Sequence, residues 1–309
     1  MLKILYLCDR KIYETKMSRV RFHTIDAIGQ ITNLTMSGPG WDGFENVSQI
    51  EESVMPDLII WYKPLNIPGY KDARAPRCLQ YNEMHDFNAT KDEIEKSGSK
   101  FIICHHLNDI DNYNTVDAKF INIQHCADIR FFKDYQQKKD IDVLLVGVLN
   151  DYIYPLRTKL VNVIQSLQQQ NFVTSLYTHP TYTITNAFNN NHIIDFAKHI
   201  NRSKITLTCS SKFRYLLGKY IEIPMCNSLL VADMPDDQVQ FLNEFIVEID
   251  ITMSINKIVE KITYYLEHDE ERCLRSQKGY NTMLSTHTQQ HYANKFVDVA
   301  KKFLNSSVL

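Results

Sequence analysis

The segment GKYIEIPMCNSLLVAD, residues 218–233, runs from a turn of predicted helix through Asn227 into a short apolar strand. Another apolar run, KITLTCS at residues 204–210, precedes this helix. Strand, helix and strand in that order are typical of a parallel sheet whose strands are joined by crossover helices. The segment therefore predicts an α/β fold. It also places Lys219 and Glu222 on one face of the helix, where a weak surface ion pair is the simplest interpretation.

The same alternation extends outward along the chain in both directions. We expect further strands at residues 3–7, 34–38, 57–62, 78–84, 101–106, 120–125, 142–149, 172–178 and 244–250. We expect helices at residues 19–30, 89–97, 154–170, 192–201 and 213–226, and helical structure from Ser254 to the end. The two halves of the chain therefore resemble each other as two α/β units.

A chain of 309 residues exceeds what one hydrophobic core usually serves, so two domains with a cleft are expected. The polar segment KDYQQKKD, residues 133–140, is the best candidate for the linker. We expect a first domain at residues 1–136 and a second domain at residues 137–285. A last amphipathic helix within residues 286–309 is expected to pack back on the first domain.

The composition is that of an ordinary globular protein, with 44% hydrophobic residues, 23% charged residues and a formal net charge of −2. This balance gives no electrostatic reason to expect nucleic acid or an anionic membrane as a partner. The opening MLKILYLCDRK is too short in its apolar part for a signal peptide, and VLLVGVL is too short to span a bilayer. We expect a cytoplasmic protein. Its seven cysteines are scattered without a zinc-binding spacing.

Six short segments, taken in order, resemble the GT-B glycosyltransferases of the group 1 or family 4 type, and within them the CgeB-like branch. The segments are DLIIWYKP (57–64), LQYNEMHDF (79–87), INIQHCADIRFF (121–132), DVLLVGVLNDYIYPLRTKL (142–160), KYIEIPMCNSLLVAD (219–233) and THTQQHYANKF (286–296). The resemblance implies two Rossmann-like parallel-sheet domains that face a cleft. It implies sugar transfer, with retention of anomeric configuration, from a UDP- or GDP-linked sugar to a glycan or other hydroxyl acceptor, without a metal cofactor.

A nucleotide sugar offers a ribose diol and a diphosphate for recognition. Glu222 suits the diol, because a carboxylate accepts hydrogen bonds from two neighbouring hydroxyls. The diphosphate would lie at the start of the helix predicted from Phe213, beside Arg214 or Lys219. Arg214 stands where the resembling family usually has a second glutamate, which leaves the identity of the transferred sugar open.

Two further donor-binding residues follow from the resemblance. Gly147 matches a glycine that lets the backbone approach the donor, although a simple turn is an alternative. Arg157 matches a cation directed toward the phosphates, although a solvated helix position is an alternative. Asn227 replaces the usual glycine of this family, a change that a left-handed backbone would tolerate.

His85, which follows an apolar run, is the candidate for sugar positioning or catalysis on the acceptor side. Glu83, two positions earlier, is a weaker candidate for the same face. Further sugar or acceptor contacts are expected from His105, Asp128 and Arg19, the last in the N-terminal loop of residues 9–23. Neighbouring residues in a strand face opposite sides, so the histidines and cysteines near these positions do not predict a metal site.

Three other functions fit parts of the sequence. A GT-A glycosyltransferase would use an Asp-x-Asp motif, which occurs at residues 109–111 and 140–142. A sugar-nucleotide epimerase could use the same two-domain architecture and would need no acceptor. A non-catalytic nucleotide-sugar binding protein would explain the missing glutamate and glycines.

Overall fold

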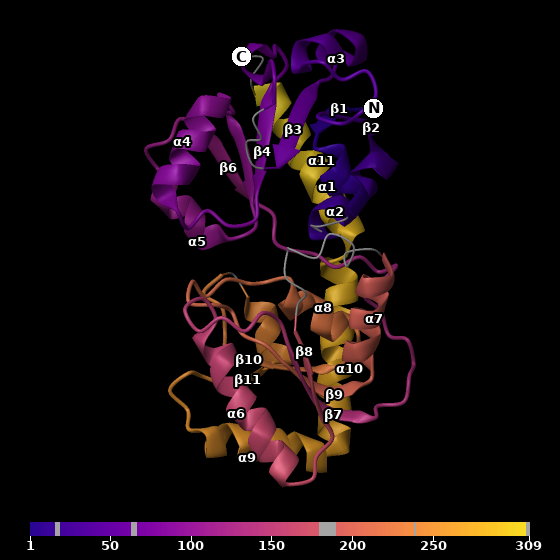
Figure 1. Cartoon of the computed structure of the whole chain (residues 1–309), viewed down its shortest axis with the longest axis vertical. Coiled ribbons are helices and arrows are strands. Elements are labelled where there is room, and N and C mark those ends of the chain that lie inside the picture. The colour runs from indigo at the N-terminus through magenta and orange to yellow at the C-terminus, as the bar shows by residue number, and fades with distance from the viewer. Residues whose placement is uncertain (16–18, 63–66, 179–189, 238, 307–309) are drawn as a thin grey trace. The chain divides into compact units, whose positions relative to one another are not determined.

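The computed structural model describes residues 1–15, 19–62, 67–178, 190–237 and 239–306 (Figure 1). The chain forms two compact units. Unit 1 consists of Met1–Gln124 and Gln289–Leu309, and unit 2 consists of His125–Thr288.

Unit 1 is built on one sheet, in which the described residues form six parallel strands in the order β2-β1-β3-β4-β5-β6. The strands are β1 (Lys3–Leu7), β2 (Asn33–Ser37), β3 (Leu58–Tyr62), β4 (Arg77–Tyr81), β5 (Phe101–Cys104) and β6 (Lys119–Asn122). The helices are α1 (Arg10–Thr15), α2 (Arg19–Ile31), α3 (Val47–Val54), α4 (Phe87–Ser97), α5 (Leu107–Ile110) and α11 (Gln289–Ser306), with 3₁₀ turns η1 (Tyr70–Asp72) and η2 (Asp111–Tyr113).

Both faces of the unit 1 sheet are covered by helices. Side chains of β1, β3, β4 and β5 on one face form a core with Val47 of α3 and Ile94 of α4. On the other face, Gln80 Nε2 of β4 donates a 2.5 Å hydrogen bond to the Tyr292 hydroxyl of α11. The Phe101 ring stacks on Phe303 of the same helix, with centroids 4.7 Å apart. The last helix therefore returns to unit 1, where it runs beside α2 (Figure 1).

Unit 2 is built on a second sheet, in which the described residues form five parallel strands in the order β11-β10-β9-β7-β8. The strands are β7 (Ile141–Val146), β8 (Thr174–Tyr177), β9 (Ser203–Leu207), β10 (Leu229–Ala232) and β11 (Val247–Glu248). The helices are α6 (Pro155–Gln169), α7 (Asn190–Asn201), α8 (Lys219–Met225), α9 (Ile255–Glu267) and α10 (Asp269–Thr286), with a 3₁₀ turn η3 (Gln240–Glu244).

Alternate residues of the central strands of unit 2 enter two separate cores. Val143 and Leu145 of β7 pack with apolar residues of α6 and α9. Leu144 and Val146 of the same strand pack with residues of α7, α8 and α10. Because each face is buried, the strands read as continuous apolar runs in the sequence, which is typical of parallel sheets.

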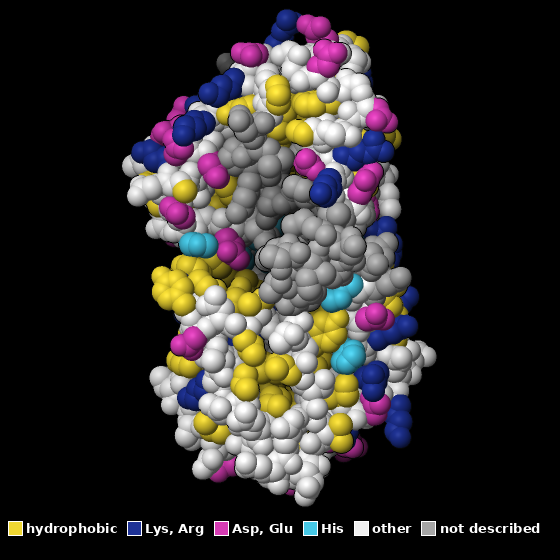
Figure 2. All heavy atoms as spheres, in the orientation of Figure 1, with side chains coloured by type: hydrophobic (Ala, Val, Ile, Leu, Met, Phe, Trp, Pro, Cys, Tyr) yellow, Lys and Arg dark blue, Asp and Glu magenta, His cyan; other side chains and the backbone are white. Residues whose placement is uncertain are grey.

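The surface carries both signs of charge. On the face in Figure 2, the described Lys and Arg side chains are interspersed with Asp and Glu side chains. Within the described helices, none combines the length and hydropathy that a membrane-spanning segment requires. All seven cysteines are free thiols, and Cys273 is the exposed one.

The α/β class and the eleven strand positions are confirmed, but two local predictions are wrong. The helix expected from residue 213 begins only at Lys219. Ser211 and Arg214 have left-handed backbones, with φ of 73° and 54°, and these conformations do not fit a right-handed helix. The N-terminal segment expected as a loop contains α1 among its described residues, whereas α2 matches the helix expected at residues 19–30.

The division between the units differs from the expected domain boundaries. Residues 125–136 belong to unit 2, as do residues 286–288. Phe131 and Phe132 are buried in the unit 2 core, which draws the segment ahead of the polar linker into that unit. The backbone N–H of Ala127 donates to the His287 carbonyl, so residues 286–288 pair with the same segment.

The polar segment 133–140 is fixed to unit 2 by hydrogen bonds. The Asp134 carboxylate accepts bonds of 2.9 Å from the Nδ2 groups of Asn201 and Asn227. Lys139 Nζ donates to the Asn227 carbonyl at 2.6 Å. Asn227 has a φ of 53°, so it adopts the left-handed backbone that a glycine would adopt here, and its side chain adds a contact that glycine lacks.

We predict that two variants of Asn227 separate these contributions. Asn227→Gly keeps the left-handed backbone and loses the bond to Asp134, so it should lower the free energy of unfolding by about 1 kcal/mol. Asn227→Ala should cost about 1 kcal/mol more, because alanine disfavours that backbone. Urea denaturation measures both values. Equal costs in the two variants would show that the backbone conformation contributes nothing.

A second prediction concerns pH and Lys139. Burial lowers the pKa of Lys139 from 10.5 to about 8, with the charge of Asp134 opposing the shift. Between pH 8 and pH 10.5 the Lys139 amine is protonated in the unfolded chain and neutral in the folded protein. Raising the pH in this range therefore favours folding. The stability of the wild type relative to Lys139→Met should therefore increase from about pH 7.5 to about pH 9.5. Urea denaturation at both pH values tests this, and a constant difference would contradict it.

Candidate functional site

The carboxyl ends of the unit 2 strands meet at one edge of the sheet. In the sheet, β8 lies on one side of β7 and β9 lies on the other. The strand order therefore reverses direction between β7 and β9, which makes this position a topological switch point. In open parallel sheets, ligands bind at the carboxyl edge beside such a switch point. Gly147 follows β7 directly, and Arg214 lies in the segment after β9. We refer to the segments 147–149, 208–214 and 233–237, which follow β7, β9 and β10, as the carboxyl-edge loops.

Arg157 is buried beneath these loops, with 2% of its surface exposed. Its Nη1 donates to the Val148 carbonyl at 2.9 Å, and its Nη2 lies 3.4 Å from Thr208 Oγ1 and 3.3 Å from the Cys209 carbonyl. The guanidinium also lies over the Tyr154 ring, 4.0 Å from the centroid. The alternative of a solvated helix position is therefore wrong.

Gly147 lies against this guanidinium. It has a φ of 116°, and a Cβ atom built on it would lie 2.7 Å from Arg157 Cζ. The absence of a side chain at this position therefore makes room for Arg157. The role of Gly147 in letting the backbone approach the donor stays a prediction.

Arg214 joins the loop after β9 to the loop after β10. Its Nε donates to Asp236 Oδ1 at 2.6 Å and its Nη2 donates to the Met234 carbonyl at 2.5 Å. The backbone N–H of Asp236 donates a hydrogen bond to the Arg214 carbonyl. These contacts hold the left-handed backbone of Arg214 in place. The helix N-terminus expected beside it lies at Lys219 instead.

A buried polar cluster that sequence reasoning missed joins the same two loops. The Asp233 carboxylate accepts bonds from the Ser210 N–H at 2.8 Å and from Ser210 Oγ at 2.5 Å. The Tyr220 hydroxyl lies 2.9 Å from Asp233 Oδ1 and 2.7 Å from its main-chain oxygen. Burial and the charge of Asp233 raise the pKa of Tyr220, which keeps the phenol protonated as a donor. The sequence feature that could have indicated this cluster is Asp233, which directly follows an apolar strand.

Glu222 lies in the first turn of α8 and is 1% exposed. Burial, followed by the charges of Asp128 and Glu222, raises the pKa of the Cys126 thiol, so both carboxylates lie near this thiol. The simple interpretation of Glu222 as part of a surface ion pair is wrong, because its carboxylate is not at the surface. Lys219 is partly exposed at the start of the same helix.

Asp128 belongs to unit 2 and is held by Arg130. Its buried carboxylate accepts three bonds of 2.6–3.0 Å from the Arg130 guanidinium and one of 2.9 Å from the Arg130 N–H. The Asp128 carbonyl also accepts the N–H groups of Phe131 and Phe132, which closes a turn. These bonds place Asp128 in a structural turn. Its role as a sugar or acceptor contact stays a prediction.

His85 and Glu83 come together in unit 1. His85 Nδ1 lies 3.7 Å from Glu83 Oε2, and both side chains are a little over one third exposed. They follow β4, which ends at Tyr81, so the period-two argument from a longer strand was wrong. The backbone leaves the sheet because the Met84 N–H donates to Asp109 Oδ2. This loop lies at the carboxyl edge of the unit 1 sheet.

His105 and Arg19 have different surroundings. His105 is 3% exposed, and its Nδ1 lies 2.8 Å from the Ile123 carbonyl after β6. Burial lowers the pKa of His105 to about 4, so the ring is neutral near pH 7. Arg19 is the first residue of α2, and its side chain lies outside the described residues.

Carboxylates in both Asp-x-Asp copies interact with groups of the protein itself. Asp140 and Asp142 pair with Arg202 and Lys204 at the amino end of β7. Asp109 is buried and accepts the Met84 N–H. Among the described residues, no cluster of three or more His, Cys, Asp or Glu side chains is arranged to hold a metal ion.

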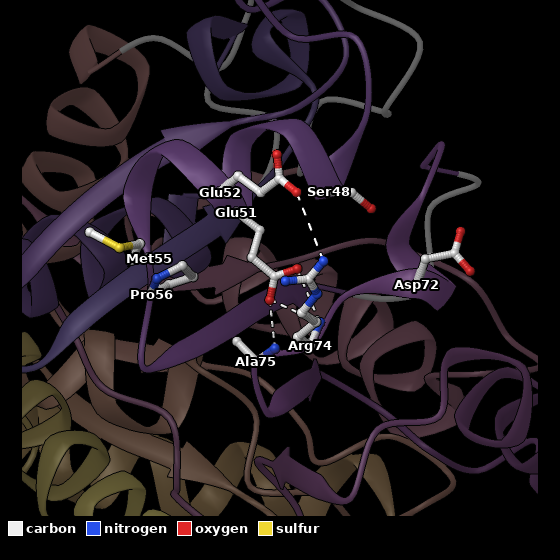
Figure 3. A pocket seen from close by; sticks show the side chains of 8 residues that line it. All are labelled: Ser48, Glu51, Glu52, Met55, Pro56, Asp72, Arg74 and Ala75. Atoms are coloured by element: carbon white, nitrogen blue, oxygen red, sulfur yellow. Dashed lines mark hydrogen bonds and ion pairs between the residues drawn. The ribbon is translucent and has the colours of Figure 1, made fainter.

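A pocket of about 550 Å³ lies in unit 1, at the amino end of its sheet (Figure 3). Figure 3 shows the Glu51 carboxylate directed at the turn of residues 74–75. It accepts the backbone N–H groups of Arg74 and Ala75 at 2.5–3.0 Å. The carboxylate thus stabilises a turn, and the pocket lies at the opposite edge of the sheet from His85.

Comparisons with known structures identify the fold. The sucrose-phosphate synthase of Thermosynechococcus elongatus aligns with a TM-score of 0.65 at 8% identity, covering 99% of this chain and 100% of that one. A glycosyltransferase of Rickettsia africae aligns at 0.61 and 12% identity, covering 98% of both chains. HepE of Anabaena in complex with UDP aligns at 0.61 and 10% identity, covering 97% of this chain and 100% of that one. The fold is therefore GT-B.

No curated protein matches this sequence. A family model described as glycosyl transferase-like matches residues 130–298, more than half of the chain and nearly all of unit 2. The chain therefore belongs to the glycosyl transferase-like family.

Proposed function

We propose that this protein is a glycosyltransferase of the CgeB-like branch that takes its sugar from a UDP- or GDP-linked donor. The supporting observation is the concentration of buried charge beside the carboxyl-edge loops of unit 2. Arg157, Glu222 and Asp233 are all buried in this region, within the part of the chain that the family model matches. Buried ionised groups are costly unless they serve structure or ligand binding.

Each feature of the donor has a candidate partner. Glu222 would accept hydrogen bonds from the ribose diol, and Lys219, in the same turn of α8, would bind the diphosphate. Arg214 would add positive charge beside the diphosphate from the loop after β9, where it is already oriented by Asp236. UDP is the first nucleotide to test, because HepE, which shares the fold, has been crystallised with UDP.

In the proposed reaction the acceptor hydroxyl oxygen bonds to the anomeric carbon while the bond from that carbon to the phosphate oxygen breaks. The hydroxyl proton passes to the departing phosphate oxygen, and the configuration is retained. The lysine and arginine side chains stabilise the charge that develops on the diphosphate, a role that needs no metal. His85 of unit 1 would position sugar hydroxyls, and Glu83, whose Oε2 lies 3.7 Å from His85 Nδ1, is a further candidate for a sugar or acceptor contact.

The assignment of Glu222 predicts a specific loss of donor affinity. Glu222→Gln preserves the shape of a buried side chain and removes the charge, so it should weaken UDP-sugar binding by about 1.5–3 kcal/mol. Glu244→Gln, an exposed residue of unit 2 that pairs with Lys278, is the matched control and should leave affinity unchanged. Isothermal titration measures both variants. An unchanged affinity in folded Glu222→Gln would remove this residue from the site.

Turnover should survive chelation of metal ions. The assay incubates the protein with UDP-sugars and hydroxyl acceptors, with and without EDTA, and follows the product anomer by NMR. We expect a retained anomer and less than about a twofold change in rate with EDTA, because side-chain cations stabilise the diphosphate. Loss of turnover with recovery in Mn²⁺ would favour the Asp-x-Asp alternative. Donor binding without turnover of any acceptor would favour a non-catalytic binding protein.

A further inference from the structure

We infer that Arg10, Tyr13, Trp41 and Asp42 of unit 1 form a carbohydrate-binding subsite, and that the acceptor in the proposed reaction is therefore a glycan. The inference rests on the proposed function only in calling the bound sugar an acceptor. It names the chemical class of the second substrate, which the candidate nucleotide site in unit 2 does not define.

The subsite lies at the switch point of the unit 1 sheet. In this sheet β2 lies on one side of β1 and β3 lies on the other, so the strand order reverses direction beside β1. Ligands of open parallel sheets bind at the carboxyl edge of such a point. Residues 8–9 follow β1 and lead into α1, and residues 38–44 follow β2, so both segments leave the sheet at this edge. The loop of His85, after β4, leaves the sheet at the same edge.

The segments after β1 and β2 are bonded to each other along their backbones. The N–H groups of Cys8 and Arg10 donate to the carbonyls of Ser37 and Pro39 at 2.9 and 3.0 Å. Gly38 has a φ of 139°, and a Cβ atom built on it would overlap the Cys8 carbonyl oxygen. A glycine is therefore required for the two segments to approach this closely. The side chains that they carry are thus held in a defined arrangement.

Two aromatic rings are fixed at the surface by these segments. Trp41 Nε1 donates to the Cys8 carbonyl at 2.9 Å, which orients the indole. The Tyr13 ring of α1 lies beside it, with centroids 5.7 Å apart and planes tilted by 45°. Both residues are partly exposed. The face of an aromatic ring is electron-rich, and the C–H groups on the face of a pyranose are weakly positive, so a fixed and exposed indole suits a stacked sugar.

Charged groups beside the rings can bond to the hydroxyls of a stacked sugar. Arg10 Cζ lies 5.9 Å from the centroid of the Trp41 ring, and Arg10 Nη1 donates to Asp42 Oδ1 at 3.0 Å. The Asp42 side chain is 96% exposed, and its Oδ2 accepts no hydrogen bond from the described residues. An ion pair this exposed adds little to stability. Its carboxylate can instead accept hydrogen bonds from two neighbouring hydroxyls, while the guanidinium donates to others.

The balance of charge favours a neutral sugar over an anionic ligand. Arg10 Nε donates to Glu14 Oε1 at 2.8 Å, so its guanidinium already faces two carboxylates, those of Glu14 and Asp42. The three side chains together carry a net negative charge, which would repel a phosphate. The subsite therefore suits an uncharged acceptor sugar rather than the diphosphate of the donor.

Tryptophan fluorescence gives a direct readout of this subsite. The chain has two tryptophans, and Trp61 is 2% exposed, so a sugar that changes the emission reports on Trp41. The probes are the methyl pyranosides of glucose, galactose, mannose and N-acetylglucosamine, with cellobiose and lactose. Because stacking uses the C–H face that pyranoses share, we expect saturable binding of at least one of these probes.

Variants of Trp41 and Asp42 separate recognition from structure, with ligand-observed NMR measuring the affinity for the bound probe. We expect Trp41→Leu to weaken binding about tenfold and Trp41→Phe, which keeps an aromatic face, less than about threefold. Asp42→Asn should weaken it about fivefold and leave the melting temperature unchanged. The affinity for UDP should be the same in all three variants.

The matched controls are Tyr264→Leu and Asp92→Asn. Tyr264 is an exposed aromatic residue of α9 in unit 2, and Asp92 is an exposed carboxylate of α4 that pairs with Lys96. Neither should change the affinity for the sugar. In turnover with a UDP-sugar, the bound probe should act as acceptor, and Trp41→Leu should raise its KM about tenfold while kcat changes less than about twofold.

Each outcome decides a separate question. The inference is overturned if no probe binds, or if folded Trp41→Leu binds the probe as tightly as the wild type. If Trp41→Leu does not melt cooperatively, Asp42→Asn decides, and an unchanged affinity in that variant counts against the subsite. Displacement of the probe by UDP-glucose would overturn the acceptor assignment. A wild type that binds neither UDP nor GDP would overturn the proposed function, while sugar binding at Trp41 is measured independently of it.

Discussion

A buried guanidinium joins the two loops at the switch point of the unit 2 sheet, and the geometry of the candidate donor site depends on it. Arg157 bonds to both loops and lies under Gly147. Arg214 and the Asp233 cluster then extend the connection from the loop after β9 to the loop after β10. Three loops that leave different strands are thus fixed by side chains rather than by sheet pairing. A site built in this way is organised before any ligand arrives, which reduces the entropy cost of binding.

The parallel sheets could be predicted from the sequence because both of their faces are buried. Strands such as β7 read as uninterrupted apolar runs, and the helices that cover them repeat with helical period. The start of α8 could not be predicted, because Ser211 and Arg214 adopt left-handed backbones without a glycine to signal them. The boundary of unit 2 was also hidden. It depends on Asp134 bonding to Asn201 and Asn227, contacts between residues that are far apart in the sequence.

The structure shows surroundings of the proposed site residues that the sequence did not indicate. Glu222 and Arg157 were identified from a resemblance, and the structure shows that both are buried, which sequence spacing alone did not indicate. Asp233 was missed because one aspartate after a strand carries no distinctive spacing. His85 and Glu83 were expected on one face of a strand and instead meet in a loop. Side-chain burial depends on contacts across the fold, and these contacts are not encoded in any local motif.

The central claim is that the carboxyl edge of the unit 2 sheet binds the nucleoside diphosphate. Hydrogen exchange of the full chain, followed by mass spectrometry with and without saturating UDP, tests it most directly. The account predicts slower exchange in segments 147–149 and 208–214 and at the start of α8. It predicts no change at the amino edge, in residues 140–142 and 202–204. Protection confined to the unit 1 pocket around Glu51 and Arg74 would contradict the account, as would binding that leaves the exchange of unit 2 unchanged.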